Sequence, residues 1–207
     1  MSSNKLQNIS KKFIDQNFYL GVAESCTGGL LAKKITDESG SSAWFDCGFI
    51  TYSNEAKIRM LGVNKESIAE FGAVSLEIAQ EMAIGVQKNS RAIFSISITG
   101  VAGPNGGSPE KPVGTVYICF AFKGSVLKDY KLQLSGERSS IREQTVCFII
   151  EELDKLTFNA FMTLRRMMEL YSQNVLFITI STNLSKIPDS IKSRCFNIRC
   201  PIIEKKI

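Results

Sequence analysis

Short apolar runs alternate with stretches of helical periodicity along the first part of the chain. In residues 75–89, Ile78, Met82 and Val86 recur at the three- to four-residue spacing of an amphipathic helix. We expect strands at residues 18–25, 47–53, 91–100, 115–124 and 126–134, and helices at residues 3–16, 27–36, 54–62, 75–89 and 139–150. Ser139 or Ser140 would cap the last helix. Such alternation predicts an α/β sandwich with a sheet at its centre.

The distribution of glycine along the chain indicates a domain boundary after this pattern. All 15 glycines precede residue 137, and in the first part they punctuate the apolar runs as tight turns do. The last part contains no glycine and predicts one helix and two short strands. We therefore place a boundary near residues 150–155, which gives a first domain of residues 1–152 and a remainder of residues 153–207.

Composition excludes several kinds of chemistry. The chain has 207 residues and no histidine, so it cannot form a Ser-His-Asp triad, a Cys-His dyad or an imidazole metal site. Acid–base catalysis near neutral pH then falls to lysine, tyrosine, cysteine, a carboxylate or a group of the substrate. The six cysteines form no CxxC pair, which speaks against a zinc site. No apolar run reaches the ~18–20 residues of a membrane span, and the N-terminus lacks the apolar core of a signal peptide, so we expect the cytoplasm.

The first candidate for chemistry is the turn AESCTGG, residues 23–29. Ser25 and Thr27 stand before Gly28 and Gly29 at the start of an expected helix. Backbone N–H groups at a helix start can bind an anion, or stabilise the oxyanion formed when Ser25 attacks a carbonyl. A plain helix cap would use the same residues, so the turn alone leaves both interpretations open.

The second candidate is the turn TYSNEAK, residues 51–57. A serine nucleophile without histidine needs another base, and Lys57 can serve if burial lowers its pKa. A solvated surface lysine is the alternative interpretation. Ser53 lies one helical turn from Lys57 and is therefore a rival nucleophile to Ser25.

The third candidate is the loop TGVAGPNGG, residues 99–107. Its glycines allow the backbone to approach a ligand closely. No Gly-Lys-Ser/Thr sequence follows them, so the loop is not a Walker A motif, and it also lacks the Rossmann fingerprint. As a pattern on its own, the loop indicates only a place where a ligand can lie.

Four segments taken together resemble the CinA-like family, the C-terminal amidase domain of competence/damage-inducible proteins, which also occurs alone as nicotinamide-nucleotide amidase. These segments are residues 22–63, 72–85, 97–117 and 135–142, in that order. The resemblance covers about residues 5–152. It implies hydrolysis of the carboxamide of nicotinamide mononucleotide, giving nicotinate mononucleotide and ammonia, by a Ser–Lys pair with no metal and no cofactor.

The resemblance also assigns roles to individual residues. It implies that Ser25 is the nucleophile and Lys57 the base, with Tyr52 alongside. Ser25 ranks above Ser53 because the glycine-rich helix start beside it offers an oxyanion hole. The residues expected to bind substrate are Thr27, Gly28, Gly29, Thr99, Gly100, Gly103, Arg138 and Arg142, with the two arginines as candidates for the phosphate.

Residues 153–207 resemble a piece of another protein, the delta-prime subunit of a DNA polymerase III clamp loader of the AAA+ class. The run NVLFITIST and the SRC at residues 193–195 carry this resemblance. The Walker A loop, most of the central sheet, the lid and the collar of that class are absent, so we expect neither ATPase activity nor clamp-loader partners. We expect an appendage from a truncated AAA+ domain that docks loosely or not at all on the first domain.

The complete expectation is a three-layer α/β sandwich with a central mixed sheet and flanking helices, followed by an appendage of one helix and two short strands. The protein would bind a small-molecule nucleotide as its substrate and would form a homo-oligomer. The formal net charge of +5 contains no basic block, so no direct nucleic-acid contact is expected. The alternatives are a catalytically impaired nucleotide-binding module and a clamp-loader interaction fragment.

Exhaustive chelation with EDTA is expected to leave the rate of amide hydrolysis unchanged. The chain offers no imidazole ligand and no paired cysteine spacing for a metal ion. Ammonia release before and after chelation measures the effect. A rate that is lost with EDTA and restored by a divalent ion would contradict this expectation and point to carboxylate ligands.

Overall fold

The computed structural model describes residues 2–156, 176–178, 195 and 198. The chain divides into two compact units, Met1–Thr157 and Phe158–Ile207. The strands and the loop expected in the tail lie outside the described residues except at 176–178, 195 and 198. The assignment of that segment to an AAA+ fragment therefore stays a prediction.

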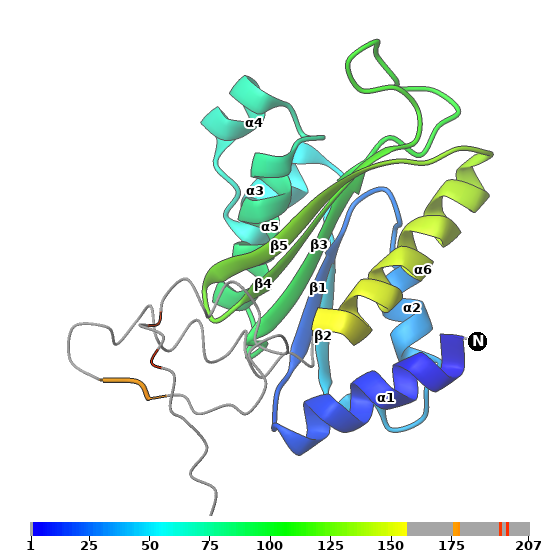
Figure 1. The fold of residues 1–207 in the computed structure, drawn as a ribbon. Helices are drawn as coiled ribbons and strands as arrows, with labels where there is room; N and C mark the ends of the chain where they lie inside the picture. Colours follow the sequence, from blue (N-terminus) through cyan, green and yellow to red (C-terminus); the bar gives the residue numbers. More distant parts are fainter. Residues whose placement is uncertain (1, 157–175, 179–194, 196–197, 199–207) are drawn as a thin grey trace, which may run out of the picture. The chain divides into compact units, whose positions relative to one another are not determined.

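A five-stranded mixed sheet forms the centre of the first unit (Figure 1). Its order is β2-β1-β3-β4-β5, with β1 parallel to β2 and β3, and with β4 and β5 added as an antiparallel hairpin. The strands are β1 (Leu20–Glu24), β2 (Phe45–Ile50), β3 (Phe94–Gly100), β4 (Thr115–Phe122) and β5 (Ser125–Gln133). The carboxyl ends of the three parallel strands therefore meet at one edge of the sheet.

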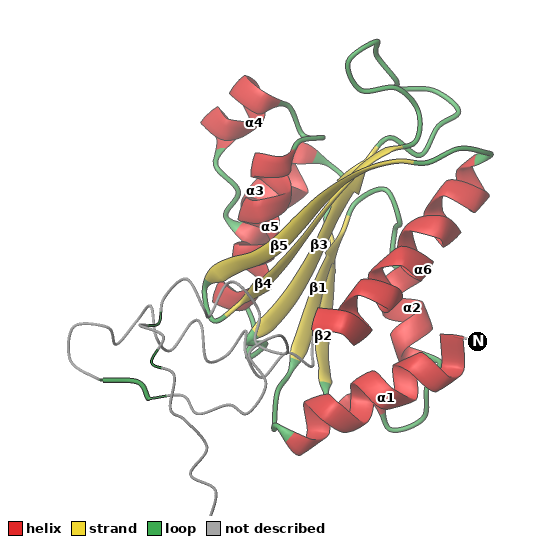
Figure 2. Cartoon of the chain, viewed as in Figure 1, coloured by secondary structure: helices red, strands yellow, loops and turns green. Residues whose placement is uncertain are grey.

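Helices cover both faces of this sheet (Figure 2). On one face α5 contacts β1, β3, β4 and β5, and α3 and α4 pack against α5. On the other face α2 contacts β1 and β2, and α6 contacts both α1 and α2. The helices are α1 (Ser2–Asp15), α2 (Leu30–Thr36), α3 (Asn54–Leu61), α4 (Lys65–Phe71), α5 (Leu76–Lys88) and α6 (Arg138–Leu156). The expected α/β sandwich with a mixed sheet and flanking helices is confirmed.

Side chains of β1 alternate between two apolar cores. Leu20 and Val22 join the core formed with α1, α2 and α6, whereas Ala23 joins Ile78 and Met82 on the α5 side. All five residues of β1 are buried. A strand that is buried on both faces has a nearly continuous apolar sequence, which explains the apolar runs of the first part of the chain.

Small and hydroxyl-bearing residues bring α5 close to the sheet. Alternate positions of β3 carry hydroxyl groups that face α5 and donate hydrogen bonds to the backbone. The donors Ser95 and Ser97 reach the carbonyl oxygens of Ala83 and Ala79 in α5, and Thr99 reaches that of Ala73, three residues before the helix begins. These hydroxyls are buried but have partners, so they give α5 a fixed position along β3 instead of a loose apolar contact.

The start of α6 differs from the expected one. The helix begins at Arg138, so Ser139 and Ser140 lie inside its first turn and neither is the cap, which makes that expectation wrong. The reason is that the N–H of Ile141 donates to the carbonyl of Glu137 at 2.9 Å, so helical hydrogen bonding already starts at Glu137. The helix therefore presents Arg138 at its first position.

The ends of two strands and one short helix also differ from the pattern. β2 ends at Ile50 and not at Ser53, because the Ser53 side chain turns to cap α3 and accepts a hydrogen bond from the N–H of Ala56 at 3.0 Å. β1 likewise ends at Glu24, one residue before Ser25. Nothing in the apolar pattern predicts α4, which is a short helix without a fully buried residue.

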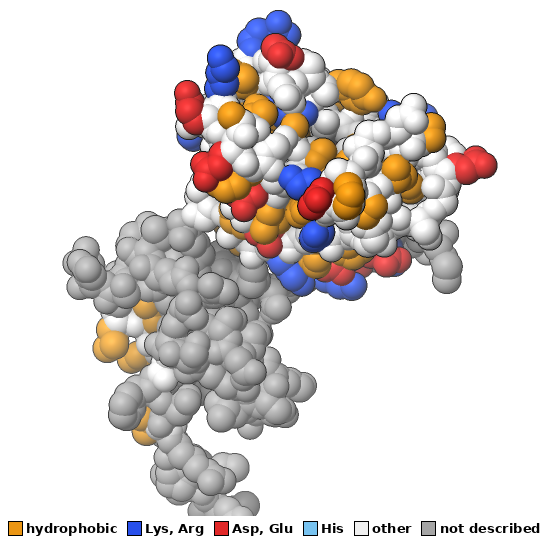
Figure 3. Space-filling model, turned by 90° about the horizontal axis from the view of Figure 1, so that it is seen from above, with side chains coloured by type: hydrophobic (Ala, Val, Ile, Leu, Met, Phe, Trp, Pro, Cys, Tyr) orange, Lys and Arg blue, Asp and Glu red, His pale blue; other side chains and the backbone are white. Residues whose placement is uncertain are grey.

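The surface of the described residues carries charges of both signs. Seen from above, lysine, arginine and carboxylate side chains are scattered over the molecule with hydrophobic side chains between them (Figure 3). No helix in the described ranges is long and apolar enough to cross a membrane.

Replacing Gly85 by alanine is expected to lower the free energy of unfolding by about 1–3 kcal/mol. A Cβ atom at this position of α5 would lie 2.2 Å from the backbone oxygen of Leu61, at the end of α3. Chemical and thermal unfolding measure the change. The matched control is Lys88→Ala, at an exposed position of the same helix, which is expected to change stability by less than about 0.5 kcal/mol. Equal stability of Gly85→Ala and the wild type would show that α3 is free to move away from α5.

Candidate active site

The candidate turns meet at the carboxyl edge of the parallel strands, which is the upper edge of the sheet in Figure 1. Ser25 directly follows β1, and Tyr52 comes two residues after the end of β2. Thr99 is the second-last residue of β3. Open α/β sheets bind ligands at this edge, because the loops of neighbouring strands converge there.

Ser25 and Lys57 form a hydrogen-bonded pair. The Nζ atom of Lys57 lies 3.1 Å from the Oγ atom of Ser25. It also donates to the backbone oxygen of Thr51 at 2.9 Å. The pair is buried, since 2% of Lys57 and 8% of Ser25 are exposed. A serine hydroxyl in contact with a buried amine is the arrangement that a histidine-free nucleophile requires.

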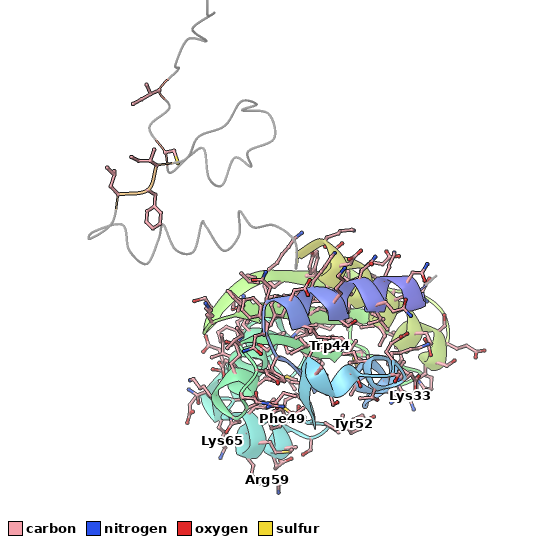
Figure 4. All side chains as sticks on the ribbon, turned by 90° about the horizontal axis from the view of Figure 1, so that it is seen from below. Lys33, Trp44, Phe49, Tyr52, Arg59 and Lys65 are labelled. Carbon is pink, nitrogen blue, oxygen red and sulfur yellow. The ribbon has the colours of Figure 1, made fainter. Side chains whose placement is uncertain are left out.

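The start of α3 places Lys57 in this pair. Ser53 caps the helix, and the backbone N–H of Lys57 donates to the carbonyl of Ser53 at 3.2 Å, one helical turn away. On the same helix Arg59 points away from the protein, as Lys65 does at the start of α4 (Figure 4). The helix thus turns one of its basic side chains inward to Ser25. Ser53 uses its hydroxyl as the cap.

Burial determines the electrostatics of the pair. Removal from water lowers the pKa of Lys57 below its ordinary value, because desolvation disfavours the ammonium form. Burial also raises the pKa of the neighbouring Cys26 thiol to about 11. The charge interaction with Cys26 raises the pKa of Lys57, but burial is the larger effect and the pKa stays lowered. Among the described residues, no carboxylate lies within salt-bridge distance of Lys57.

A cavity of about 280 Å³ opens beside the pair. Seven residues expected from the sequence line it: Ser25, Tyr52, Lys57, Thr99, Gly100, Gly103 and Arg138. Cys26, Asn54, Ala73 and Val74 line it as well and were not anticipated. In the part of the chain that the structure describes, no three cysteine or carboxylate side chains are grouped so as to hold a metal ion.

Arg138 connects two walls of this cavity. Its Nη1 atom donates to the carbonyl of Gly103 at 2.8 Å, and its Nη2 atom donates to the hydroxyl of Tyr52 at 2.9 Å. Tyr52 is 62% exposed, so this contact lies at the mouth of the cavity. The first residue of α6 thereby holds the glycine-rich loop and the TYSNEAK turn together.

Arg142 lies one turn further along α6 and contacts the AESCTGG turn. Its Nε atom donates to the carbonyl of Thr27 at 3.1 Å, and Nη2 donates to the same oxygen. Arg142 also lines a second hollow of about 760 Å³, which adjoins the first one because both include Gly103 and Arg138. Thr27, Gly28 and Gly29 do not line either hollow.

The backbone N–H groups of the AESCTGG turn are less available than the sequence suggested. The carboxylate of Glu24 accepts hydrogen bonds from the N–H groups of Gly29, Leu31 and Ala32 at 3.0, 3.2 and 2.8 Å. Sequence reasoning missed Glu24. The available signal was an acidic residue inside a strand whose other members are apolar, because a buried carboxylate requires partners.

A known protein family matches most of this chain. The family described as CinA C-terminal domain matches residues 3–157. This chain belongs to that family. The expected CinA membership is thus confirmed for the first unit, and the clamp-loader resemblance of the tail stays a prediction.

Two relatives illustrate how the family is built. The nicotinamide-nucleotide amidohydrolase PncC of Escherichia coli strain K12 is 52% identical over 131 residues, which are 63% of this chain and 79% of that protein. A CinA-like protein of Leptospira biflexa serovar Patoc is 46% identical over 153 residues, which are 72% of this chain and 37% of that protein. The chain therefore spans well under half the length of the longer relatives.

Solved structures agree with this membership. The crystal structure of the competence/damage inducible protein CihA from Agrobacterium tumefaciens has a TM-score of 0.71 and 43% identity, covering 75% of this chain and 94% of that chain. A CinA superfamily protein from Klebsiella pneumoniae has a TM-score of 0.72 and 32% identity, covering 76% of this chain and 98% of that chain.

Lys57→Arg is expected to lower the turnover number by about 10²–10⁴-fold, the usual contribution of a general base. Guanidinium keeps its proton at working pH, so it cannot accept the proton of Ser25. In the wild type the rate is expected to rise with pH as Lys57 loses its proton, with a midpoint below 10.5, because burial lowers its pKa. Steady-state kinetics over a pH series measure both effects.

The same burial predicts how stability depends on pH. Between the pKa of Lys57 in the folded protein and its ordinary value, only the unfolded chain binds the proton, so this group makes the free energy of unfolding rise with pH.

The matched control for Lys57→Arg is Lys33→Arg, at an exposed lysine that pairs with Asp37, and it should keep the wild-type rate. A near-normal rate in Lys57→Arg would show that the lysine acts only as a fixed positive charge.

Proposed function

We propose that this chain hydrolyses the carboxamide of nicotinamide mononucleotide to nicotinate mononucleotide and ammonia. The observation that carries the proposal is the 3.1 Å contact between the buried Nζ atom of Lys57 and the Oγ atom of Ser25, beside a cavity at the carboxyl edge of the sheet. The substrate is inferred from relatives at about 50% identity that are named nicotinamide-nucleotide amidohydrolases.

The reaction follows from a neutral amine beside a hydroxyl. Lys57 accepts the proton of Ser25 while Oγ attacks the carboxamide carbon, and the protonated lysine then gives a proton to the leaving nitrogen as the C–N bond breaks. Ammonia leaves and an acyl-enzyme ester remains. Water, deprotonated by Lys57, attacks this ester. As the C–Oγ bond breaks, Lys57 returns the proton to Oγ and the acid is released. One amide and one water give one acid and one ammonia, and no cofactor enters the balance.

The oxyanion of the tetrahedral intermediate needs hydrogen-bond donors in the nucleophile turn. Among the described residues, the backbone N–H groups of Cys26 and Thr27 donate to no backbone or side-chain oxygen, whereas that of Gly28 donates to the carbonyl of Ser25 at 3.1 Å. The N–H of Gly29 is bonded to Glu24. We therefore assign the oxyanion to the N–H group of Cys26, because Cys26 lines the cavity and Thr27 does not. This narrows the original expectation, which included both glycines.

The phosphate of the substrate is proposed to lie in the second hollow, beside the start of α6. Arg138 and Arg142 line this hollow, and its link to the first cavity allows one ligand to occupy both. Both guanidinium groups already donate hydrogen bonds to protein oxygens. Because a guanidinium carries five N–H groups, each arginine still has N–H groups that can bind an anion. The nicotinamide ring would lie in the first cavity, surrounded by Tyr52, Thr99, Gly100 and Gly103.

Other features of the expectation also belong to this proposal. We place the enzyme in the cytoplasm as a homo-oligomer, without direct nucleic-acid contact. The boundary expected near residues 150–155 falls inside α6, which ends at Leu156. The segment after the first unit, residues 158–207, is proposed not to take part in catalysis.

Ser25→Ala is expected to abolish ammonia release, because it removes the attacking oxygen. Ser53→Ala should retain turnover, since the Ser53 hydroxyl caps α3 through the N–H of Ala56. It should lose about 1 kcal/mol of stability, the usual effect of removing a helix cap. An assay of ammonia release from nicotinamide mononucleotide, together with thermal unfolding, measures both variants.

Two results would contradict the proposal. Activity that survives in Ser25→Ala and disappears in a folded Ser53→Ala would assign the nucleophile to Ser53. A wild-type protein that binds nicotinamide mononucleotide and releases no ammonia would be the impaired binding module. Calorimetric binding to Ser25→Ala is the control that separates loss of chemistry from loss of the pocket.

A further inference from the structure

A buried carboxylate immediately precedes the nucleophile. Glu24 is the last residue of β1 and is 0% exposed. Its side chain reaches across the AESCTGG turn to the first turn of α2, where Oε2 accepts from Gly29 and Leu31 and Oε1 accepts from Ala32. The strand end and the helix start are thereby tied by one side chain, with Ser25 in the segment between them.

The carboxylate is held by backbone N–H groups in place of a cationic side chain. Among the described residues, Glu24 forms no salt bridge with a lysine or arginine. An ionised carboxylate is costly to bury, and here three N–H groups at the positive end of a helix offset that cost. A neutral serine or asparagine cap satisfies only one or two such groups. The Glu24 carboxylate therefore binds more N–H groups than a simple helix cap does.

The segment that carries Ser25 has little stiffness of its own. Gly28 and Gly29 have φ angles of +57° and +93°, in the left-handed region that glycine enters freely. Within the turn, the N–H of Gly28 donates to the carbonyl of Ser25 at 3.1 Å and that of Leu30 to the carbonyl of Thr27 at 3.2 Å. Further restraints come from other parts of the chain: the N–H of Ser25 donates to the carbonyl of Ile98 at 3.0 Å, and Arg142 donates to the carbonyl of Thr27. Glu24 fixes the glycine end, which neither of these last two contacts reaches.

We propose that Glu24 is a positioning residue for catalysis: its carboxylate fixes the glycine turn so that Ser25 Oγ stays in contact with Lys57 and the Cys26 N–H faces the cavity. It also occupies the first N–H groups of α2, which leaves only the start of the turn to receive an oxyanion. This inference rests on the proposed amide hydrolysis. Glu24 itself neither lines the cavity nor exchanges a proton with the substrate.

The test is Glu24→Gln, which keeps the size of the side chain. The amide replaces one acceptor oxygen by an NH₂ group that faces backbone N–H donors, and it removes the charge. We expect the turnover number to fall by about 10–100-fold, the effect of a small misplacement of a reacting group. We expect KM to stay within about twofold, because the cavity walls that bind substrate are unchanged.

A matched control separates this effect from a general loss of stability. Glu152 is also a buried carboxylate, 8% exposed, and accepts hydrogen bonds from Tyr130 and Lys155 near the far end of α6. Glu152→Gln should destabilise the protein and leave the turnover number unchanged.

Cysteine alkylation followed by peptide mapping gives a readout that does not depend on activity. Cys26 lies in the nucleophile turn, and Cys119 is fully buried in β4. In Glu24→Gln we expect Cys26 to react severalfold faster than in the wild type while Cys119 stays protected, which is the signature of local opening. Glu24→Asp retains the charge but is too short for all three donors, so faster labelling of Cys26 in that variant reports loosening alone.

Each outcome decides between the interpretations. A lower turnover number with unchanged KM and faster labelling of Cys26 alone supports the inference. Unchanged turnover, a rise in KM alone, or parallel exposure of Cys26 and Cys119 overturns it, the last because it shows a purely structural role. If Glu24→Gln does not fold, Glu24→Asp takes its place in the same comparison. A wild-type protein without amidase activity would refute the proposed function, whereas an active wild type with an equally active Glu24→Gln refutes only the role of Glu24.

Discussion

The removal of one amine from water is the constraint on which the candidate site depends. An exposed lysine is protonated at neutral pH and cannot take a proton from serine, whereas burial lowers the pKa of Lys57. The protein compensates this unfavourable burial with two hydrogen bonds from Nζ, one to Ser25 and one to the carbonyl of Thr51. A carboxylate partner would stabilise the amine more strongly but would also keep it protonated. The absence of such a partner among the described residues is consistent with a base.

The packing beneath the site determines where this amine lies. Lys57 is carried by α3, which lies directly against α5 because Gly85 has no side chain at the contact with Leu61. α5 in turn is aligned on β3 by the hydroxyls of Ser95 and Ser97. The position of Nζ relative to the end of β1 therefore depends on small residues in the core, which lie far from the site in sequence.

The last helix of the first unit completes the site from the other face. Arg138 joins the mouth of the cavity to the glycine-rich loop through Tyr52 and Gly103, and Arg142 holds the nucleophile turn at Thr27. The contacts of Arg138 with Tyr52 and of Arg142 with Thr27 join residues 86 and 115 positions apart, so they form only when α6 is docked on the sheet. Together with Glu24, these arginines surround the turn of Ser25 with charged groups that all act through hydrogen bonds.

The α/β alternation and the family could be predicted from the sequence, the family through its four motif segments. The same resemblance proposed Ser25 as nucleophile and Lys57 as base, and the absence of histidine agrees with that proposal. Only the tertiary structure decided that Lys57 meets Ser25 while Ser53 caps a helix. It also decided that the Glu24 carboxylate accepts a hydrogen bond from the backbone N–H of Gly29. These contacts depend on strand crossovers and on the depth of helix packing, and the local pattern of apolar and polar residues does not encode either quantity.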